Sequence, residues 1–85
     1  MRKISLIIPI YNESDHLEEF LGVIDSLELA LPKELVFIDD CSKDNSREIL
    51  KSYRFMSEAK LLFQDENAGK GAALARGIKE ASGDI

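Results

Sequence analysis

Two adjacent carboxylates, Asp39 and Asp40, follow the short apolar run Leu35–Ile38, which has the composition of a buried strand. At a strand end such a pair can accept hydrogen bonds from the N–H or hydroxyl groups of a ligand. A metal ion would need more ligands, and no nearby histidine or third carboxylate completes a set. One aspartate could equally cap the turn before the next helix. The pair therefore leaves ligand binding and turn capping open.

A second polar cluster, Asn67–Gly71, leads into an alanine-rich segment. Glycines before a helix let the backbone approach a ligand, the helix N-terminus favours an anion, and Lys70 adds a cation. The alternative is a helix-entry loop with a solvated lysine. A Walker A loop is excluded because Gln64 stands at its first glycine and Gly71 at its Ser/Thr position. No G-x-G-x-x-G follows the first apolar run, so the dinucleotide fingerprint is absent too.

A third cluster, Pro9–Glu13, follows the first apolar run. The ring of Tyr11 could stack on a base, and Glu13 could accept a ribose hydroxyl. Alternatively, Tyr11 packs on the sheet edge and Glu13 sits in a first helical turn, where the helix dipole favours a carboxylate. Cys41 has no histidine near it in sequence, so a nucleophilic role is not expected.

The elements that must position these clusters alternate between short apolar runs and helical periods. Strands are predicted at Ile4–Pro9, Leu35–Ile38 and Ala59–Phe63. Helices are predicted at residues 17–31, ended by Pro32, then from Asn45 through Tyr53, and finally over 73–81. Candidate N-caps are Asn12 and Ser14 for the first helix, and Asn45 with Glu48 forms a capping box for the second.

The resulting order, β-α-β-α-β-α, predicts a parallel sheet with right-handed crossovers, a Rossmann-like three-layer α/β/α fold over residues 1–85. Ligands of such sheets bind beyond the carboxyl ends of the strands, where all three polar clusters fall. Ile85 is expected to begin a fourth strand, so we expect these residues to be the N-terminal piece of a longer protein. A sheet ending there would leave an open edge, and self-association through it is expected.

Composition narrows the classes of function. The 85 residues are 45% hydrophobic and 32% charged, an ordinary globular balance, and the net charge of −5 argues against nucleic-acid binding and a polybasic membrane surface. One cysteine excludes an internal disulfide framework. The chain lacks a membrane-spanning apolar run and a signal-peptide pattern. We therefore expect a cytoplasmic, soluble chain.

Four motifs occur together in order: Ile4–Glu13, Val36–Ser46, Asn67–Ala73 and Ala81–Ile85. With them the chain resembles the N-terminal half of family 2 glycosyltransferases of the GT-A fold, over essentially its whole length. The Gly-Lys-Gly form of the third motif is similar to the subgroup that uses polyprenyl-phosphate acceptors, although enzymes that make cell-envelope polysaccharides share much of the pattern. Arg76 falls at a position to which the resemblance assigns no role.

The resemblance implies transfer of a sugar from a UDP- or GDP-linked donor to an acceptor. It places Pro9, Tyr11 and Glu13 at the nucleoside, Asp40 at the base with Asp39 beside it, and Lys70 near the nucleotide. The family's D-x-D motif, which holds Mg²⁺ or Mn²⁺ on the diphosphate, is expected beyond Ile85. These residues alone are therefore expected to hold neither the metal nor the catalytic groups, and to lack transferase activity.

Two other classes of protein are alternatives to a glycosyltransferase. A nucleotide-binding α/β module without catalysis would share the cleft residues and would need no D-x-D motif. A receiver-like regulatory domain would carry its acidic pair after the first strand, where this chain has Pro9–Glu13, so that pattern fits poorly. Membrane association is expected only through other parts of the complete protein.

Overall fold

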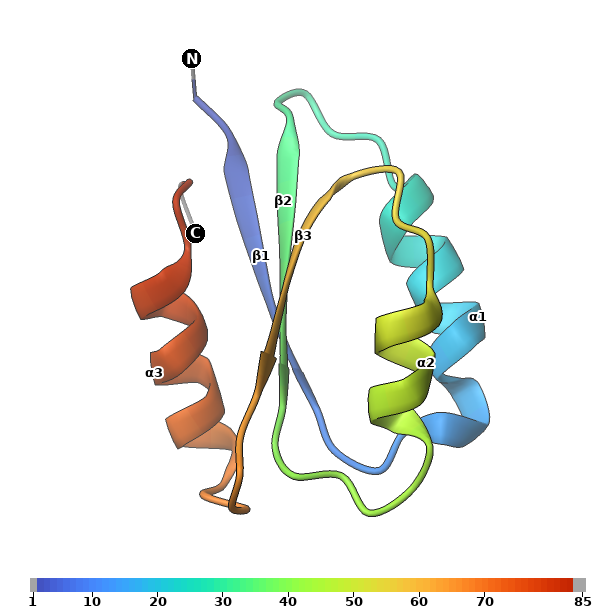
Figure 1. Cartoon of the computed structure of the whole chain (residues 1–85). Coiled ribbons are helices and arrows are strands. Elements are labelled where there is room, and N and C mark those ends of the chain that lie inside the picture. The colour runs from blue at the N-terminus through green and yellow to red at the C-terminus, as the bar shows by residue number, and fades with distance from the viewer. Residues whose placement is uncertain (1, 84–85) are drawn as a thin grey trace.

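The computed structural model describes residues 2–83, and in it a parallel sheet lies between two helical layers (Figure 1). The elements, in chain order, are β1 (Ile4–Ile10), α1 (Ser14–Ser26), β2 (Lys33–Asp39), α2 (Ser46–Ser52), β3 (Glu58–Phe63) and α3 (Lys70–Glu80). This is the predicted α/β order, and the Rossmann-like three-layer architecture is confirmed. The predicted start of a fourth strand at Ile85 lies outside the described residues.

The sheet has the order β1-β2-β3, and both pairings are parallel. Ile4 pairs with Lys33 at one end of the first ladder and Ile10 with Asp39 at the other. As a result the three loops that follow the strands meet at one end of the molecule, opposite the N-terminus (Figure 1). The register therefore brings the three polar clusters of the sequence together.

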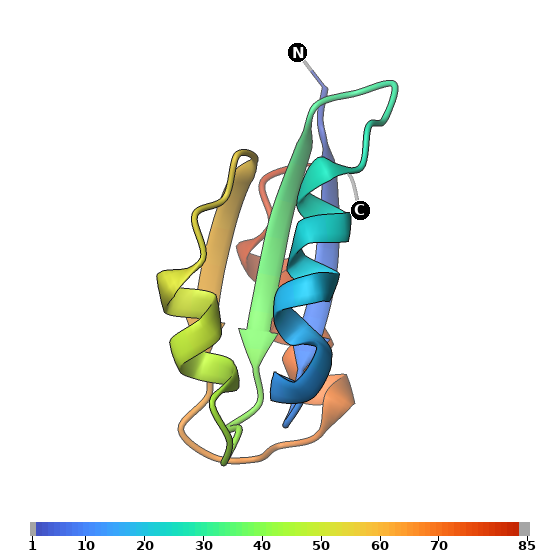
Figure 2. The same ribbon diagram turned by 90° about the vertical axis from the view of Figure 1, so that its right-hand side faces the viewer.

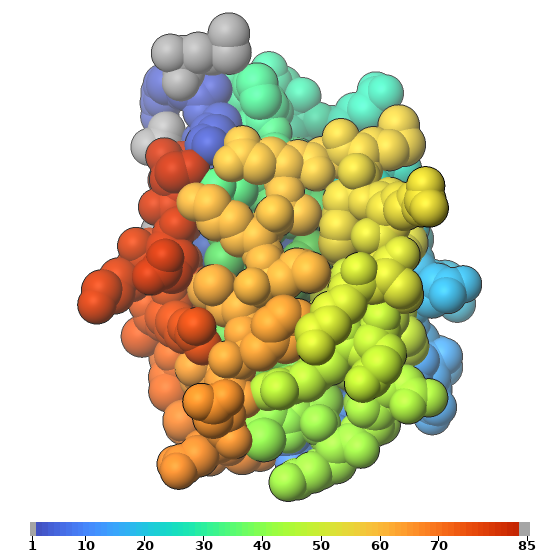
Figure 3. Space-filling model, in the orientation of Figure 1, coloured from blue at the N-terminus to red at the C-terminus, as the bar shows by residue number. Residues whose placement is uncertain are grey.

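The central strand β2 supplies both halves of the core because its side chains alternate between the two faces of the sheet. Leu35 and Phe37 pack under α1 and α2, with Leu17, Leu21 and Leu50. Val36 and Ile38 point to the other face, where Ala73 of α3 covers them. Figure 2 shows α1 and α2 side by side in front of the sheet with α3 behind it. Figure 3 shows β3 between the side chains of α2 and α3.

The first helix is shorter than its apolar period predicts. It ends at Ser26, and Leu27 is already extended, so the prediction that it runs to Pro32 is wrong. The reason is tertiary: the Lys33 ammonium bonds the carbonyl oxygens of Asp25 and Leu27 at 2.9 and 2.8 Å. Those contacts satisfy carbonyls that another helical turn would have used. The leucines beyond Ser26 follow the helical spacing without being helical.

The predicted helix caps are also corrected. Glu13, rather than Asn12 or Ser14, holds the N-cap position of α1, and Asn45 holds that of α2. No capping hydrogen bond from either N-cap side chain occurs in the described chain, so the box between Asn45 and Glu48 does not form. The donors at these helix ends are satisfied by side chains from neighbouring loops, as described below.

The opposite end of the sheet is joined through Glu34, a fully buried carboxylate in β2. It accepts hydrogen bonds from the Ser5 hydroxyl at 2.8 Å and from the Ser82 N–H at 3.0 Å, and it forms an ion pair with Lys60 at 3.0 Å. This network ties the segment after α3 to the start of the sheet. Across residues 2–83 the structure has no helix with the length and apolarity to cross a bilayer.

Candidate functional site: a cleft at the carboxyl ends of the strands

An open cleft of about 620 Å³ lies where β1 and β2 end and α3 begins. Its walls come from β1, the loops after the three strands and the first turns of α3. The lining residues are Ile7, Pro9, Ile10, Tyr11, Glu13, Asp40, Asn67, Gly69, Lys70 and Leu74. Five of the six residues predicted at the site, Pro9, Tyr11, Glu13, Asp40 and Lys70, are among them. The structure thus brings these five residues together in one cleft.

Asp40 is the carboxylate of this cleft. It is only 5% exposed, and its two oxygens accept the N–H groups of Ala68 and Gly69, each at 3.0 Å. The carboxylate therefore holds the loop after β3 against the end of β2. Each carboxylate oxygen has a second lone pair, so Asp40 can still accept a hydrogen bond from a ligand.

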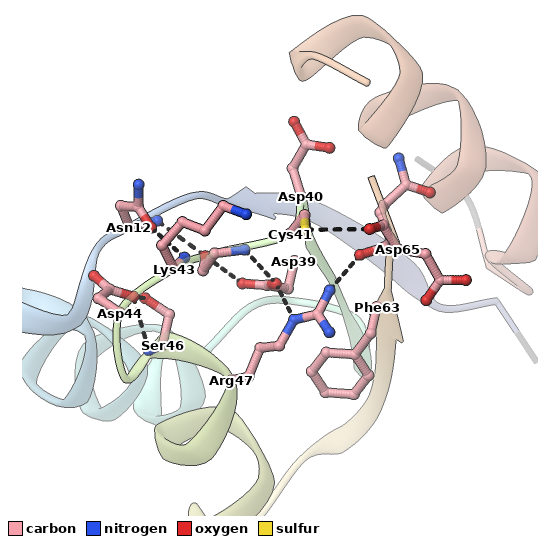
Figure 4. Close-up of polar contacts among 12 residues, drawn as sticks. Asn12, Asp39, Asp40, Cys41, Lys43, Asp44, Ser46, Arg47, Phe63 and Asp65 are labelled. Carbon is pink, nitrogen blue, oxygen red and sulfur yellow. Dashed lines mark hydrogen bonds and ion pairs between the residues drawn. The ribbon is translucent and has the colours of Figure 1, made fainter. Parts of the chain in front are cut away.

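Asp39 is not among the cleft-lining residues. It is fully buried and accepts hydrogen bonds from the Ser42 N–H at 2.9 Å and from the Arg47 Nε at 2.6 Å. It also accepts a hydrogen bond from the Ser42 hydroxyl. Figure 4 shows its side chain directed towards Arg47, whereas Asp40 points away from that arginine. Turn capping, one of the two readings of the pair, thus describes Asp39, and its contact with a nucleotide stays a prediction.

Lys70 and Tyr11 line the cleft from different elements. Lys70 is the first residue of α3, and Gly69 before it has φ +90°, a conformation that glycine adopts without strain. The Gly69 carbonyl accepts the Ala73 N–H at 3.2 Å, which starts the helix. Tyr11 is 43% exposed. An exposed ring, a carboxylate and an ammonium group can respectively stack on a base, accept a hydroxyl and attract a phosphate.

Two arginines hold the end of β3, and sequence reasoning assigned neither a role. Arg47 donates to the carbonyl oxygen of Gln64 as well as to Asp39, and its guanidinium lies 5.3 Å from the centre of the Phe63 ring (Figure 4). Its hydrogen bond to Asp39 raises the pKa of Arg47. Arg76, from α3 on the other face, donates to the Phe63 carbonyl at 3.0 Å. The start of the loop that leads to Lys70 is thus fixed from both faces of the sheet.

Sequence reasoning also missed Ser42 and Asp44 on the loop before α2 and Ser46 at the first position of that helix. Burial alone would raise the pKa of Asp44, but hydrogen bonds from the Ser46 hydroxyl and N–H and from the Ser14 N–H outweigh it and hold that pKa well below its ordinary value. The signal in the sequence was the run of small polar residues after Asp39 and Asp40. By itself such a run indicates only a polar turn. The residues that Ser42 and Asp44 bond, Asn12 and Ser14, are 30 residues away in the sequence.

A divalent metal, which the resemblance implies for the complete enzyme, has no ready site here. Among residues 2–83 no three His, Cys, Asp or Glu side chains are grouped so that they could hold a metal ion. Asp40 already accepts two backbone N–H groups. The described residues therefore do not fit such an ion by themselves.

The fold and cleft define a class: a parallel α/β domain with a ligand cleft at the carboxyl ends of its strands. The sequence profile described as Glycosyl transferase family 2 matches residues 5–85. The chain therefore belongs to glycosyl transferase family 2, and the resemblance inferred from its motifs is confirmed.

Individual relatives agree with this assignment. The dolichol-phosphate mannosyltransferase of Pyrococcus furiosus is 39% identical over 83 residues, which are 98% of this chain and 24% of that enzyme. The poly-beta-1,6-N-acetyl-D-glucosamine synthase of Staphylococcus epidermidis is 38% identical over 79 residues, or 93% of this chain and 19% of the synthase. The crystal structure of S. aureus TarS 1–349 in complex with UDP superposes with a TM-score of 0.84 at 29% identity, covering 98% of this chain and 25% of TarS. The chain thus spans about a quarter or less of the length of these proteins.

Proposed function

We propose that this chain forms the nucleotide-sugar-binding half of the GT-A domain of a glycosyltransferase that takes a hexose from a UDP- or GDP-linked donor. The observation that carries the proposal is the convergence of Tyr11, Glu13, Asp40 and Lys70 on one cleft. The UDP complex of a structural neighbour that covers 98% of this chain supports a nucleotide as ligand.

Each cleft residue has a role in this proposal. The ring of Tyr11 stacks on the base, and Asp40 accepts a hydrogen bond from its N–H group. Glu13 accepts a ribose hydroxyl, and Lys70 at the start of α3 attracts the diphosphate. Pro9 and Ile7 form the apolar floor. The roles are complementary because they cover the aromatic, hydroxyl and anionic parts of one ligand.

For the complete protein, we propose a polyprenyl phosphate or a cell-envelope glycan as acceptor, since the names of the two curated relatives refer to dolichol phosphate and to a polysaccharide. We propose that the complete protein lies in the cytoplasm, at the inner face of the membrane. A Mg²⁺ or Mn²⁺ ion on the donor diphosphate would neutralise the charge that develops on the leaving group. We propose that a D-x-D motif outside these 85 residues holds that ion, and that the chain alone binds a nucleotide without transferring sugar.

The test is a two-dimensional amide NMR titration of the 85-residue chain with UDP and then GDP. Shift changes are expected at Tyr11, Glu13, Asp40 and Lys70, and the nucleotide that binds more tightly identifies the donor base. Tyr11→Ala should weaken binding by about 1–2 kcal/mol through lost stacking. The control is Phe20→Ala, which removes another partly exposed ring that lies outside the cleft.

Two results would contradict the proposal. One is a folded chain whose spectrum ignores both nucleotides. The other is a set of amide shift changes that lies outside the cleft and that Tyr11→Ala leaves unchanged. The same sample, incubated with a UDP- or GDP-sugar, Mg²⁺ and a polyprenyl phosphate, should give no product, and metal-dependent product would overturn the expected inactivity.

A further inference from the structure

The backbone N–H groups that lead into α1 are satisfied by side chains from a distant part of the chain. Three consecutive backbone donors are involved: Asn12 to the Ser42 hydroxyl at 2.9 Å, Glu13 to the Ser46 hydroxyl at 3.0 Å, and Ser14 to the Asp44 Oδ2 at 3.1 Å. Helix N-termini leave such donors without partners inside the helix. In this chain the loop between β2 and α2, together with the first residue of α2, provides the caps of α1 across about 30 residues of sequence.

Asp44 is the centre of this contact, as Figure 4 shows for its bonds to Ser46. While Oδ2 accepts from Ser14, Oδ1 accepts the Ser46 N–H at 2.9 Å and the Ser46 hydroxyl at 2.6 Å. One carboxylate therefore joins the beginnings of α1 and α2. Both helix ends carry partial positive charge, and a negative group between them stabilises their close approach.

The loop held in this way is strained. Asn12 has φ +51°, which is uncommon outside glycine, and its side-chain oxygen accepts the Lys43 N–H at 2.7 Å. A strained backbone persists where its surroundings fix it. The loop also carries Tyr11 and Glu13, the two residues of this segment that line the cleft.

We propose that Asp44 is a positioning residue for the nucleotide cleft: it holds the loop of Tyr11 and Glu13 at the distance from Asp40 that a nucleotide requires. Asp44 is not itself among the cleft-lining residues. The inference rests on the proposed function. It adds a residue that acts through backbone N–H groups rather than by touching the ligand.

A purely local role would use only one side of the carboxylate. Capping α2 requires the bonds from Ser46 to Oδ1, which are contacts two residues apart. The bond from Ser14 to Oδ2 adds nothing to α2 and connects a separate segment. The positioning role therefore predicts effects at Glu13 and Ser14 that a local cap would not produce.

The test compares Asp44→Asn with Asp15→Asn in the 85-residue chain. Asparagine keeps the shape of the side chain but turns an NH₂ group towards the N–H of either Ser14 or Ser46, so one hydrogen bond becomes a contact between donors. Asp15 is an exposed acidic residue in the first turn of α1, so its variant makes the same charge change at the same helix end.

Two readouts separate positioning from general destabilisation. In Asp44→Asn, amide exchange should accelerate about tenfold or more at Glu13 and Ser14, while Ala68 and Gly69, held by Asp40, keep their wild-type rates. The Kd for the nucleotide that the wild type prefers, UDP or GDP, should rise about tenfold, as it does when the competent arrangement is populated a tenth of the time. Asp15→Asn should leave both the exchange rates at Glu13 and Ser14 and the nucleotide Kd unchanged.

The inference is overturned if folded Asp44→Asn binds the nucleotide with the wild-type Kd, or if exchange rises equally throughout the chain. Should Asp44→Asn fail to fold, Ser46→Ala decides by the same two readouts, because it removes the hydroxyl that accepts the Glu13 N–H and donates to Asp44. The proposed function fails by a different result, the absence of UDP and GDP binding in the wild-type chain. In that case the exchange rates at Glu13 and Ser14 alone decide whether Asp44 holds the loop.

Discussion

Glu34 is a charged residue without exposed surface, and it lies in β2, the strand whose apolar side chains form the centre of the core. Isolated burial would raise the pKa of this carboxyl, but hydrogen bonds from the Ser82 N–H, the Ser5 hydroxyl and the Lys60 ammonium outweigh it and hold the pKa far below the ordinary value of 4.5. A buried charge that is surrounded by donors in this way is stabilising only while all its partners remain.

This gives a prediction for Glu34→Gln. The variant should lose about 3 kcal/mol of unfolding free energy at pH 7, because Lys60 and the hydroxyls lose their charged partner. Because the folded-state pKa of Glu34 is depressed, its stabilisation is complete above pH 4.5 and is lost as the pH falls below that value. The wild type should therefore lose stability below pH 4.5 more steeply than the variant.

Urea unfolding of both proteins at several pH values measures this difference. Glu28→Gln is the matched control, since it removes an exposed glutamate and should leave both the stability and its pH dependence near the wild type. Parallel pH profiles for Glu34→Gln and the wild type would contradict the prediction, because they would mean that the pKa of Glu34 is the same in the folded and unfolded states.

At the same scale, residue type predicted which side chains meet at the cleft but not how each is used. Asp39 and Asp40 look equivalent in the sequence, and the register of β2 turns one towards Arg47 and the other towards the loop of Gly69. Glu34 and Asp44 were not singled out because their partners lie far away in the chain. A single sequence carries no signal for such pairs.

For the elements, periodicity predicted more than boundaries. The three strands and three helices occur in the predicted order because their apolar patterns are strong. The first helix nevertheless stops at Ser26, since Lys33 bonds the carbonyls of Asp25, in its last turn, and of Leu27, just beyond it. Propensity cannot anticipate a tertiary contact of this kind.

The third helix allows a prediction from two glycines. A Cβ at Gly77 would lie 2.5 Å from side-chain atoms of Ile7 and Ile38, whereas a Cβ at Gly71 would meet no described atom within 4 Å. Gly77→Ala should destabilise the chain by about 1–2 kcal/mol, because overpacking exceeds the gain in helix propensity. Gly71→Ala should stabilise it by about 0.5 kcal/mol, since only the propensity changes.

Thermal or urea unfolding of the two variants side by side measures both signs, and each serves as the control for the other. Equal stabilisation by the two substitutions would mean that α3 does not lie as close to β1 and β2 as the structure has it. Equal destabilisation would instead point to a backbone requirement for glycine in this helix.

At the scale of the whole molecule, the two edges of the described sheet differ in character. The β3 edge carries Glu58 and Lys60, charges of the kind that discourage strand pairing. The β1 edge is apolar and is flanked by two hollows of about 300 and 460 Å³. Phe20 lines the smaller hollow and Ile78 the larger, and they are 40% and 50% exposed. Apolar surface along an open edge favours association.

We therefore predict that the 85-residue chain self-associates through the β1 edge. Sedimentation velocity over a concentration series should show a dimer whose fraction rises with concentration. Ile78→Lys should shift the distribution to monomer, because it places a charge in the larger hollow. Met56→Lys is the control, because Met56 is 93% exposed and lines neither hollow. A wild type that stays monomeric at every concentration would exclude this association. A dimer that Met56→Lys and Ile78→Lys weaken equally would place the contact away from the β1 edge.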